Sequence, residues 1–415
     1  MPTRLAAVPA LALATSLAVA GCGADEPPAS SAPPDGPAAS ASDDHGEVAG
    51  AVEVDEPPLG LTTIDRAGVV RHLDLLDETA TDLADLGRAR AVHTDGRFVF
   101  AQTPRGVEVV DSGVWTWDHV DHFHYYRAEP RQVGRVVGRG PVTVATTSSS
   151  TSGGSGLFFG SGEAVMLDTG ALADGEVVER YRLDVAPHDG MLVPVGDAAL
   201  LTEPGPTGRA ARVVVLDAEG RPTGEEHPCR HAASTVTTRV GAVVGCADGA
   251  LLATVEDDVL QVRRIDLPPR ADAPAPTSFA GRDGRPTVAG LADAGRVWLL
   301  DTREESWRLL DAPVPLAQVT AVDDDDEHVV GLTTDGRVAV IDGGSGDLLA
   351  TTGPLAGRSL RDGVGVPTLV VDQQRAYLSA PAERRLHEID FADDARVART
   401  FRTPTPPLLL AGTGR

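Results

Sequence analysis

The chain has 415 residues and a formal net charge of −25, with 36 basic residues against 61 Asp and Glu. This length is enough for one large repeat domain or two ordinary ones. The acidic balance argues against a nucleic-acid partner, because the chain has no excess of basic side chains to displace counterions from phosphates.

The first 22 residues predict export. Arg4 precedes an uncharged, apolar run from Leu5 to Ala20, which is too short to span a bilayer and ends in small residues. Its end, Val19-Ala20-Gly21-Cys22, resembles the bacterial lipobox; the alternative is an ordinary secretory signal with a chance Cys. We expect residues 1–21 to be a lipoprotein signal peptide. Lipidated Cys22 would then anchor an extracytoplasmic protein to the cell membrane without crossing it.

The residues after Cys22 predict a tether. Residues 22–52 are dominated by Ala, Pro, Ser, Asp and Glu, and they lack the apolar periodicity that a buried core needs. We therefore expect a flexible acidic tether, followed by one folded domain over residues 53–415.

That domain is predicted to be all-β. Helix signals are almost missing, and short β-rich segments alternate with Asp-Gly, Gly-Arg and Pro turns. A motif recurs in which a strand and a turn are followed by a second strand that ends in Asp; Gly106–Asp111 and Gly336–Asp342 are examples of that second strand. Its spacing of roughly 40 to 60 residues is the period of a four-stranded propeller blade. We expect a β-propeller, with eight blades favoured over seven, and a strand from Pro407–Leu410 that closes the ring on the first blade.

Two cysteines remain beside Cys22. In an oxidising compartment Cys229 and Cys246 are expected to form a disulfide, which would close a loop of about 17 residues. The alternative is a pair of thiolate metal ligands.

Histidines are concentrated in one segment, from His119 to His124. On a strand, His122 and His124 project to the same face, so both imidazoles can reach one ion. His119 and Asp121 can join only through a bend. Imidazole and carboxylate ligands suit zinc, and a site without thiolates can release its metal. The alternative is a solvated hairpin with hydrogen-bonded histidines.

Two more histidines precede later strand segments. His188 and His231 stand at similar points of later repeats, and the inner strands of a propeller converge on its axis. We therefore expect His122, His124, His188 and His231 to form a tetrahedral zinc site.

The motifs Asp121–Ala128, Ala186–Gly190, Cys229–His231 and Gly245–Gly249 resemble the periplasmic zinc metallochaperones of the Azt type. The resemblance implies a β-propeller that passes zinc to the solute-binding protein of a zinc ABC transporter. Asp189 stands where that family commonly has a second His. The family's metal-binding N-terminal segment is reduced here to Asp43–Glu47, in which His45 is a candidate ligand; the alternative is that this stretch is plain linker.

Three functions therefore compete. The first is a monomeric zinc metallochaperone that is not an enzyme. The second is an envelope lipoprotein scaffold that binds other proteins through the propeller rim, and it predicts no bound metal. The third is a propeller hydrolase, which is the weakest because no nucleophile elbow such as Gly-x-Ser-x-Gly stands out.

Overall fold

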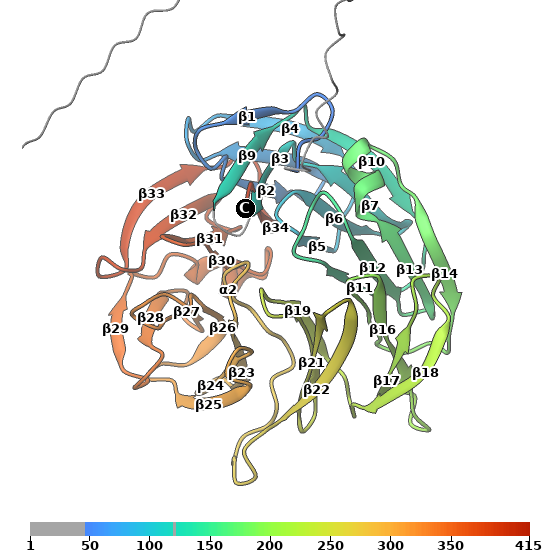
Figure 1. Ribbon diagram of the computed structural model, residues 1–415. Helices are drawn as coiled ribbons and strands as arrows, with labels where there is room; N and C mark the ends of the chain where they lie inside the picture. Colours follow the sequence, from blue (N-terminus) through green and yellow to red (C-terminus); the bar gives the residue numbers. More distant parts are fainter. Residues whose placement is uncertain (1–45, 119–121) are drawn as a thin grey trace, which may run out of the picture. The chain divides into compact units, whose positions relative to one another are not determined.

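The computed structural model describes residues 46–118 and 122–415, and this part of the chain is built almost entirely of β-strands (Figure 1). The strands form antiparallel sheets of three or four that follow one another along the chain. Two short helices, α1 (Thr169–Asp174) and α2 (Gly357–Asp362), lie in connections. Neither these nor any other described helix is long and apolar enough to cross a membrane. The prediction of an all-β fold is confirmed.

The first four sheets hold these strands: sheet 1, β2 (Gly60–Ile64), β3 (Val69–Asp74), β4 (Ala80–Asp85) and β34 (Leu409–Thr413); sheet 2, β5 (Ala91–Thr94), β6 (Phe98–Thr103), β7 (Gly106–Asp111) and β10 (Arg131–Val136); sheet 3, β11 (Val142–Thr146), β12 (Gly154–Phe159), β13 (Glu163–Asp168) and β14 (Glu179–Asp184); sheet 4, β15 (Leu192–Val195), β16 (Ala198–Pro204), β17 (Ala210–Leu216) and β18 (Pro222–Pro228).

The next four hold these: sheet 5, β19 (Ser234–Thr237), β20 (Ala242–Cys246), β21 (Gly249–Glu256) and β22 (Val259–Asp266); sheet 6, β23 (Thr287–Asp293), β24 (Arg296–Asp301) and β25 (Ser306–Asp311); sheet 7, β26 (Leu316–Ala321), β27 (His328–Thr333), β28 (Val338–Asp342) and β29 (Leu348–Thr351); sheet 8, β30 (Leu369–Val371), β31 (Ala376–Ala380), β32 (Arg385–Asp390) and β33 (Arg396–Arg402). A further three-stranded sheet, the hairpin sheet, joins β1 (Val52–Val54) to β9 (Phe123–Arg127) and β8 (Val114–Asp118).

The recurring motif ends in Asp because the Asp side chain bonds the backbone of the turn that follows. The segment Gly106–Asp111 is β7, and the strand β28 ends at Asp342. Oδ1 of Asp342 accepts hydrogen bonds from the backbone N–H groups of Gly344 at 2.8 Å and Ser345 at 2.6 Å. An Asp side chain thus offers the next backbone donors a partner outside the sheet, and the strand stops there.

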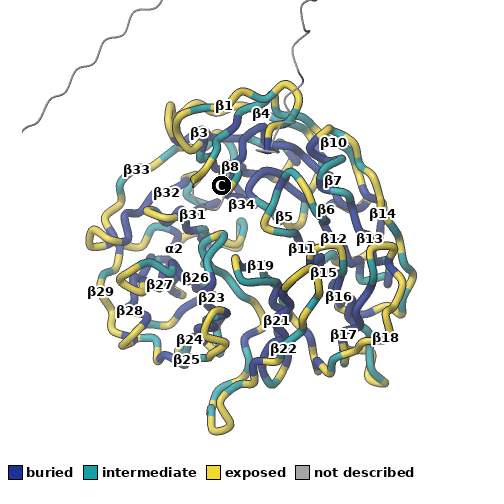
Figure 2. Tube along the Cα trace, viewed as in Figure 1, coloured by how far each residue is buried: buried dark blue, intermediate teal, exposed yellow. Residues whose placement is uncertain are grey.

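The apolar core lies between neighbouring sheets. Phe98 and Phe100 of β6 share one buried cluster with Leu157 and Phe159 of β12, which belongs to the next sheet. Figure 2 shows the buried segments toward the inside and exposed ones along outer strands such as β14 and β18. Because inner strands are covered on both faces, they read as continuous apolar runs rather than as a polar–apolar alternation.

The C-terminal strand completes the sheet that holds the first long strand. β34 pairs with β2 from Gly60 opposite Thr413 to Ile64 opposite Leu409. The sequence predicted this strand at Pro407–Leu410; the observed strand begins at Leu409, because Pro407 has no N–H to give to a ladder. The pairing brings the two ends of the folded chain into one sheet.

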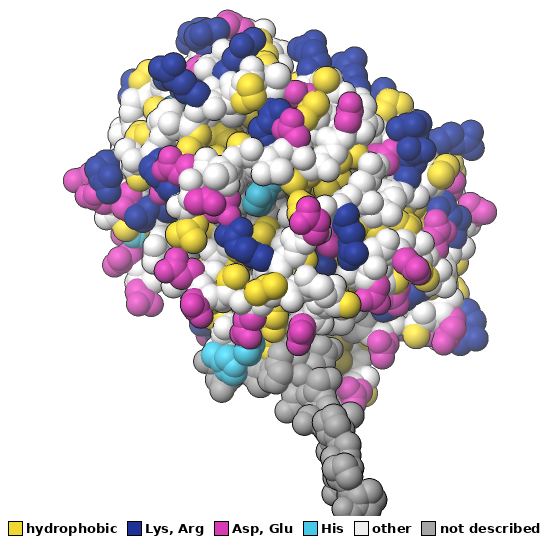
Figure 3. All heavy atoms as spheres, turned by 90° about the horizontal axis from the view of Figure 1, so that it is seen from above, with side chains coloured by type: hydrophobic (Ala, Val, Ile, Leu, Met, Phe, Trp, Pro, Cys, Tyr) yellow, Lys and Arg dark blue, Asp and Glu magenta, His cyan; other side chains and the backbone are white. Residues whose placement is uncertain are grey.

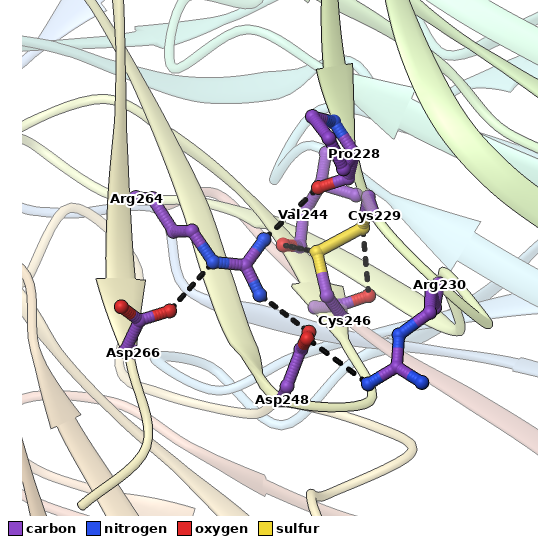
Figure 4. Close-up of a disulfide and its surroundings, with 9 residues drawn as sticks. Pro228, Cys229, Arg230, Val244, Cys246, Asp248, Arg264 and Asp266 are labelled. Atoms are coloured by element: carbon purple, nitrogen blue, oxygen red, sulfur yellow. Dashed lines mark hydrogen bonds and ion pairs between the residues drawn. A yellow bond between two sulfur atoms is a disulfide. The ribbon is translucent and has the colours of Figure 1, made fainter.

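The predicted disulfide is confirmed. Cys229 follows β18 and Cys246 ends β20; their Cα atoms lie 5.1 Å apart and the sulfurs are bonded (Figure 4). Both residues are buried. Arg264 from β22 donates to the carbonyl of Pro228 at 2.9 Å beside them. The alternative of two thiolate metal ligands is wrong, because the sulfurs are joined to each other.

Replacing Cys229 and Cys246 together by Ala is expected to lower the free energy of unfolding by about 3 kcal/mol, because the cross-link restricts the unfolded chain. Urea unfolding of the oxidised wild type and of the variant measures this difference. Alkylation of the exported, unreduced protein followed by mass spectrometry is the matching check. Two alkylated thiols in the exported protein would contradict the assignment.

Candidate metal site

The histidine-rich segment forms a hairpin outside the eight sheets. β8 and β9 are inserted between β7 and β10 of sheet 2, and β1 pairs with the other side of β9. In Figure 1, β9 runs from the periphery, beside β1, toward the C-terminus. This hairpin sheet carries His122 just before β9 and His124 within it.

The base of the hairpin is held by a buried ion pair. Arg97 and Asp111 are almost completely buried, and the guanidinium donates to Oδ1 at 3.0 Å and to Oδ2 at 2.8 Å. The same guanidinium lies 3.8 Å from the ring centroid of Trp115 on β8, and Trp115 stacks on Tyr126 of β9 at 5.3 Å. A desolvated cation over an indole is a strong contact, so the hairpin leaves the domain at a defined angle.

The other end of the hairpin reaches a distant sheet. Oδ2 of Asp118, at the end of β8, lies 3.5 Å from Nη2 of Arg239 in the turn between β19 and β20. Between these ends, the hydroxyl of Thr116 donates to the carbonyl of Gly414 at 2.9 Å. The hairpin therefore extends from sheet 2 past the C-terminus to sheet 5.

A cavity of about 570 Å³ is lined in part by Arg415, the residue after Gly414. Its walls include residues of the first strands of several sheets, β5, β11, β19 and β30, together with the C-terminal Arg415. Gly96 at the end of β5 accepts a hydrogen bond from Gly414, which in turn bonds Thr116. The hairpin thus contacts the chain at Gly414, next to Arg415, which lines this cavity.

The two hairpin imidazoles converge. Nε2 of His122 lies 2.9 Å from Nε2 of His124, and the ring centroids are 4.7 Å apart. In a tetrahedral zinc site with Zn–N bonds of about 2.05 Å, two nitrogens stand about 3.3 Å apart. A small rotation of either ring therefore places both nitrogens at ligand distance from one ion. Figure 3 shows a group of histidine side chains at the lower edge of the view.

A carboxylate backs one of the two rings. Oε1 of Glu53, on β1, lies 2.6 Å from Nδ1 of His124. Glu53 was not among the predicted site residues, since it stands 71 positions before His124, directly after the segment that we assigned to the tether. The signal that can find it is the alternation Val52-Glu53-Val54, which is typical of a short strand.

His188 is engaged within its own sheet. It is buried; its Nδ1 lies 2.7 Å from the carbonyl of Ala186 and its Nε2 lies 3.0 Å from the hydroxyl of Thr202. Its ring packs edge-on against Phe158. Both ring nitrogens therefore have protein partners between sheets 3 and 4, and the neighbouring Asp189 is exposed.

His231 lies in the turn that follows Cys229. It is exposed, its backbone has a φ of 53°, and its N–H donates to Ala210. Within residues 46–118 and 122–415, no three His, Cys, Asp or Glu side chains form a group that can hold a metal ion. The structure thus brings together His122 and His124 and does not add His188 or His231. His45, His119 and Asp121 lie outside the described residues.

These observations define an all-β protein of successive antiparallel sheets with a pair of converging imidazoles on an added hairpin, of which His122 is exposed and His124 is half-buried. No protein-family model matches the chain. The chain is similar to the zinc chaperone AztD of Citrobacter koseri, at 23% identity over 320 residues, which cover 74% of this chain and 73% of that protein.

Solved structures give the same fold. The crystal structure of Citrobacter koseri AztD matches with a TM-score of 0.71 at 21% identity, over 85% of this chain and 97% of that one. The dihydro-heme d1 dehydrogenase NirN matches less well, with a TM-score of 0.54 at 15% identity, over 92% of this chain and 83% of that one. At these identities the structural matches speak for the fold alone.

Proposed function

We propose that this protein is an extracytoplasmic zinc metallochaperone, which binds zinc and delivers it to the solute-binding protein of a zinc ABC transporter. The observation that carries the proposal is the convergence of Nε2 of His122 and Nε2 of His124, with Glu53 behind one ring. Similarity to a zinc chaperone over three quarters of the chain supports it. Zinc is here the cargo, and the protein is not an enzyme.

The proposed site suits a cargo that must leave again. Two imidazoles on an exposed hairpin hold zinc without thiolates and leave coordination positions open to an incoming ligand. Further ligands are proposed from His119 and Asp121, which come between β8 and β9 in the sequence, and from His45. The residue after His45, Gly46, packs against the ring of Trp117, directly across the hairpin from His124, and its carbonyl accepts from Trp115.

For the fold, we propose an eight-bladed β-propeller. Sheets 1 to 8 are its blades, the pairing of β34 with β2 closes the ring, and the hairpin sheet is an addition to one face. We keep the proposal that residues 1–21 are a signal peptide, that Cys22 is lipidated, and that residues 22–52 tether a monomeric domain to the membrane.

Metal analysis of the protein without its signal peptide tests the function. Protein loaded with zinc and passed over a desalting column is expected to retain about one ion per chain. In a second step, zinc should pass to the solute-binding protein faster than to the same concentration of a small chelator, since transfer is proposed to require contact. A chain that retains no zinc would overturn the proposal and favour the scaffold.

The tether is expected to speed capture and transfer. Deleting residues 23–45 should slow zinc movement to the acceptor while the domain keeps its own ion, because the deletion removes His45 but spares Gly46 against Trp117. A matched variant replaces residues 23–44 by an equally long Gly/Ser segment and keeps His45. Stopped-flow transfer kinetics compare the three proteins. Equal rates in all three would show that the segment is only a spacer.

A further inference from the structure

Glu53 reaches the histidine pair from another part of the chain. Its carboxylate lies 2.6 Å from Nδ1 of His124, whereas Nε2 of the same ring faces His122. A neutral imidazole carries one proton, and a carboxylate at Nδ1 holds that proton there. The lone pair then resides on Nε2, the nitrogen that points to the proposed ion.

From this geometry we infer that Glu53 is a positioning residue for zinc: it sets the tautomer and the orientation of His124 and thereby slows release of the ion. The inference rests on the proposed function and concerns the same site. A metal-ligating imidazole is held more firmly when its second nitrogen donates to a carboxylate, because the negative charge raises the basicity of the ring.

The carboxylate is delivered by β1, the strand that follows the tether. Three residues pair with β9, and Glu53 stands opposite Tyr126. The strand is weakly buried, since Val52 is 64% exposed and the side chain of Glu53 is 57% exposed. A strand that buries so little apolar surface detaches at low cost in free energy. Contacts that displace β1 would therefore also withdraw the carboxylate from His124.

Two substitutions separate charge from hydrogen bonding. Glu53→Ala removes both and is expected to speed zinc dissociation by about 10 to 100-fold. Glu53→Gln keeps a carbonyl oxygen that accepts from Nδ1–H but loses the charge, so its rate should fall between those of Ala and wild type. Glu56→Ala is the control, an exposed carboxylate three residues further along the same segment, and its rate should equal that of wild type.

The zinc-loaded protein is mixed with excess chromogenic chelator to measure the rates. Nitrogen NMR of the metal-free protein reports the His124 tautomer, which is expected to be Nδ1–H in the wild type and in Glu53→Gln, and mixed in Glu53→Ala. A merely structural effect of Glu53 would leave the tautomer unchanged.

Wild-type dissociation rates in Glu53→Ala would overturn this inference while leaving the histidine pair as the zinc site. A wild-type protein that binds no zinc would instead overturn the proposed function, so the two failures are distinguishable. Circular dichroism and thermal midpoints of the variants should match wild type, because Glu53 is exposed and lies on a three-residue strand at the edge of its sheet.

Discussion

Replacing His122 and His124 together by Ala is expected to abolish zinc retention at neutral pH. Loss of the hydrogen-bond partner of one ligand already costs about 10 to 100-fold in affinity, so loss of two ligands is expected to cost at least about 100-fold. Isothermal titration or competition with a chelator of known affinity measures the loss. Stoichiometric zinc retained by the double variant would refute the assignment.

The fold should survive this double substitution. The hairpin is held by Trp115 over the buried Arg97 and by the Asp118–Arg239 ion pair, and neither contact involves the imidazoles. His231→Asn serves as the second variant, since Asn tolerates a positive φ and removes the imidazole. Unchanged zinc affinity is expected there. A large loss would reinstate His231 as a ligand.

Acid is expected to destabilise the domain through two buried histidines. Burial lowers the pKa of His72 to about 4 and the pKa of His387 to about 4. Because unfolded histidine has a pKa near 6.5, unfolding takes up protons between these values. Their stabilising contribution is therefore complete above about pH 6.5 and is lost as the pH falls to 4, by roughly 3 kcal/mol for each residue.

Asn can replace His72 and His387 and keep their hydrogen bonds to threonine. In both residues Nδ1 faces a threonine hydroxyl, at 3.1 Å for His72 with Thr62 and 3.1 Å for His387 with Thr400. Asn places an amide near the position of Nδ1 and does not titrate. His72→Asn with His387→Asn should therefore flatten the dependence of unfolding free energy on pH between 6.5 and 4, measured by urea titration at several pH values.

Two carboxyls, those of Asp95 and Asp283, act in the opposite direction, since burial raises the pKa of both. Burial raises the pKa of Asp95 to about 7, so its protonation favours the folded state as the pH falls below 7. The wild type and the double Asn variant share the contribution of the carboxyls. The difference between their unfolding free energies therefore reports the two histidines alone. An unchanged slope in the double Asn variant would contradict the assignment.

Local patterns determined much of this protein. The recurring motif that ends in Asp predicted strands such as β7 and β28, because a short apolar run and an Asp-capped turn involve only neighbouring residues. The pairing of His122 with His124 followed from the two-residue period of a strand, and the Cys229–Cys246 bond followed from there being only two candidates in the folded domain.

Tertiary structure alone decided which distant residues meet. Glu53 reaches His124 because β1 adds to the edge of β9, and Asp118 reaches Arg239 because the hairpin extends from sheet 2 to sheet 5. His188 looked equivalent to the hairpin histidines, yet Thr202 on the adjoining strand takes its Nε2. Such contacts depend on how whole sheets are placed and on which hydroxyl or carboxylate each sheet edge presents. No periodicity within one segment encodes that placement.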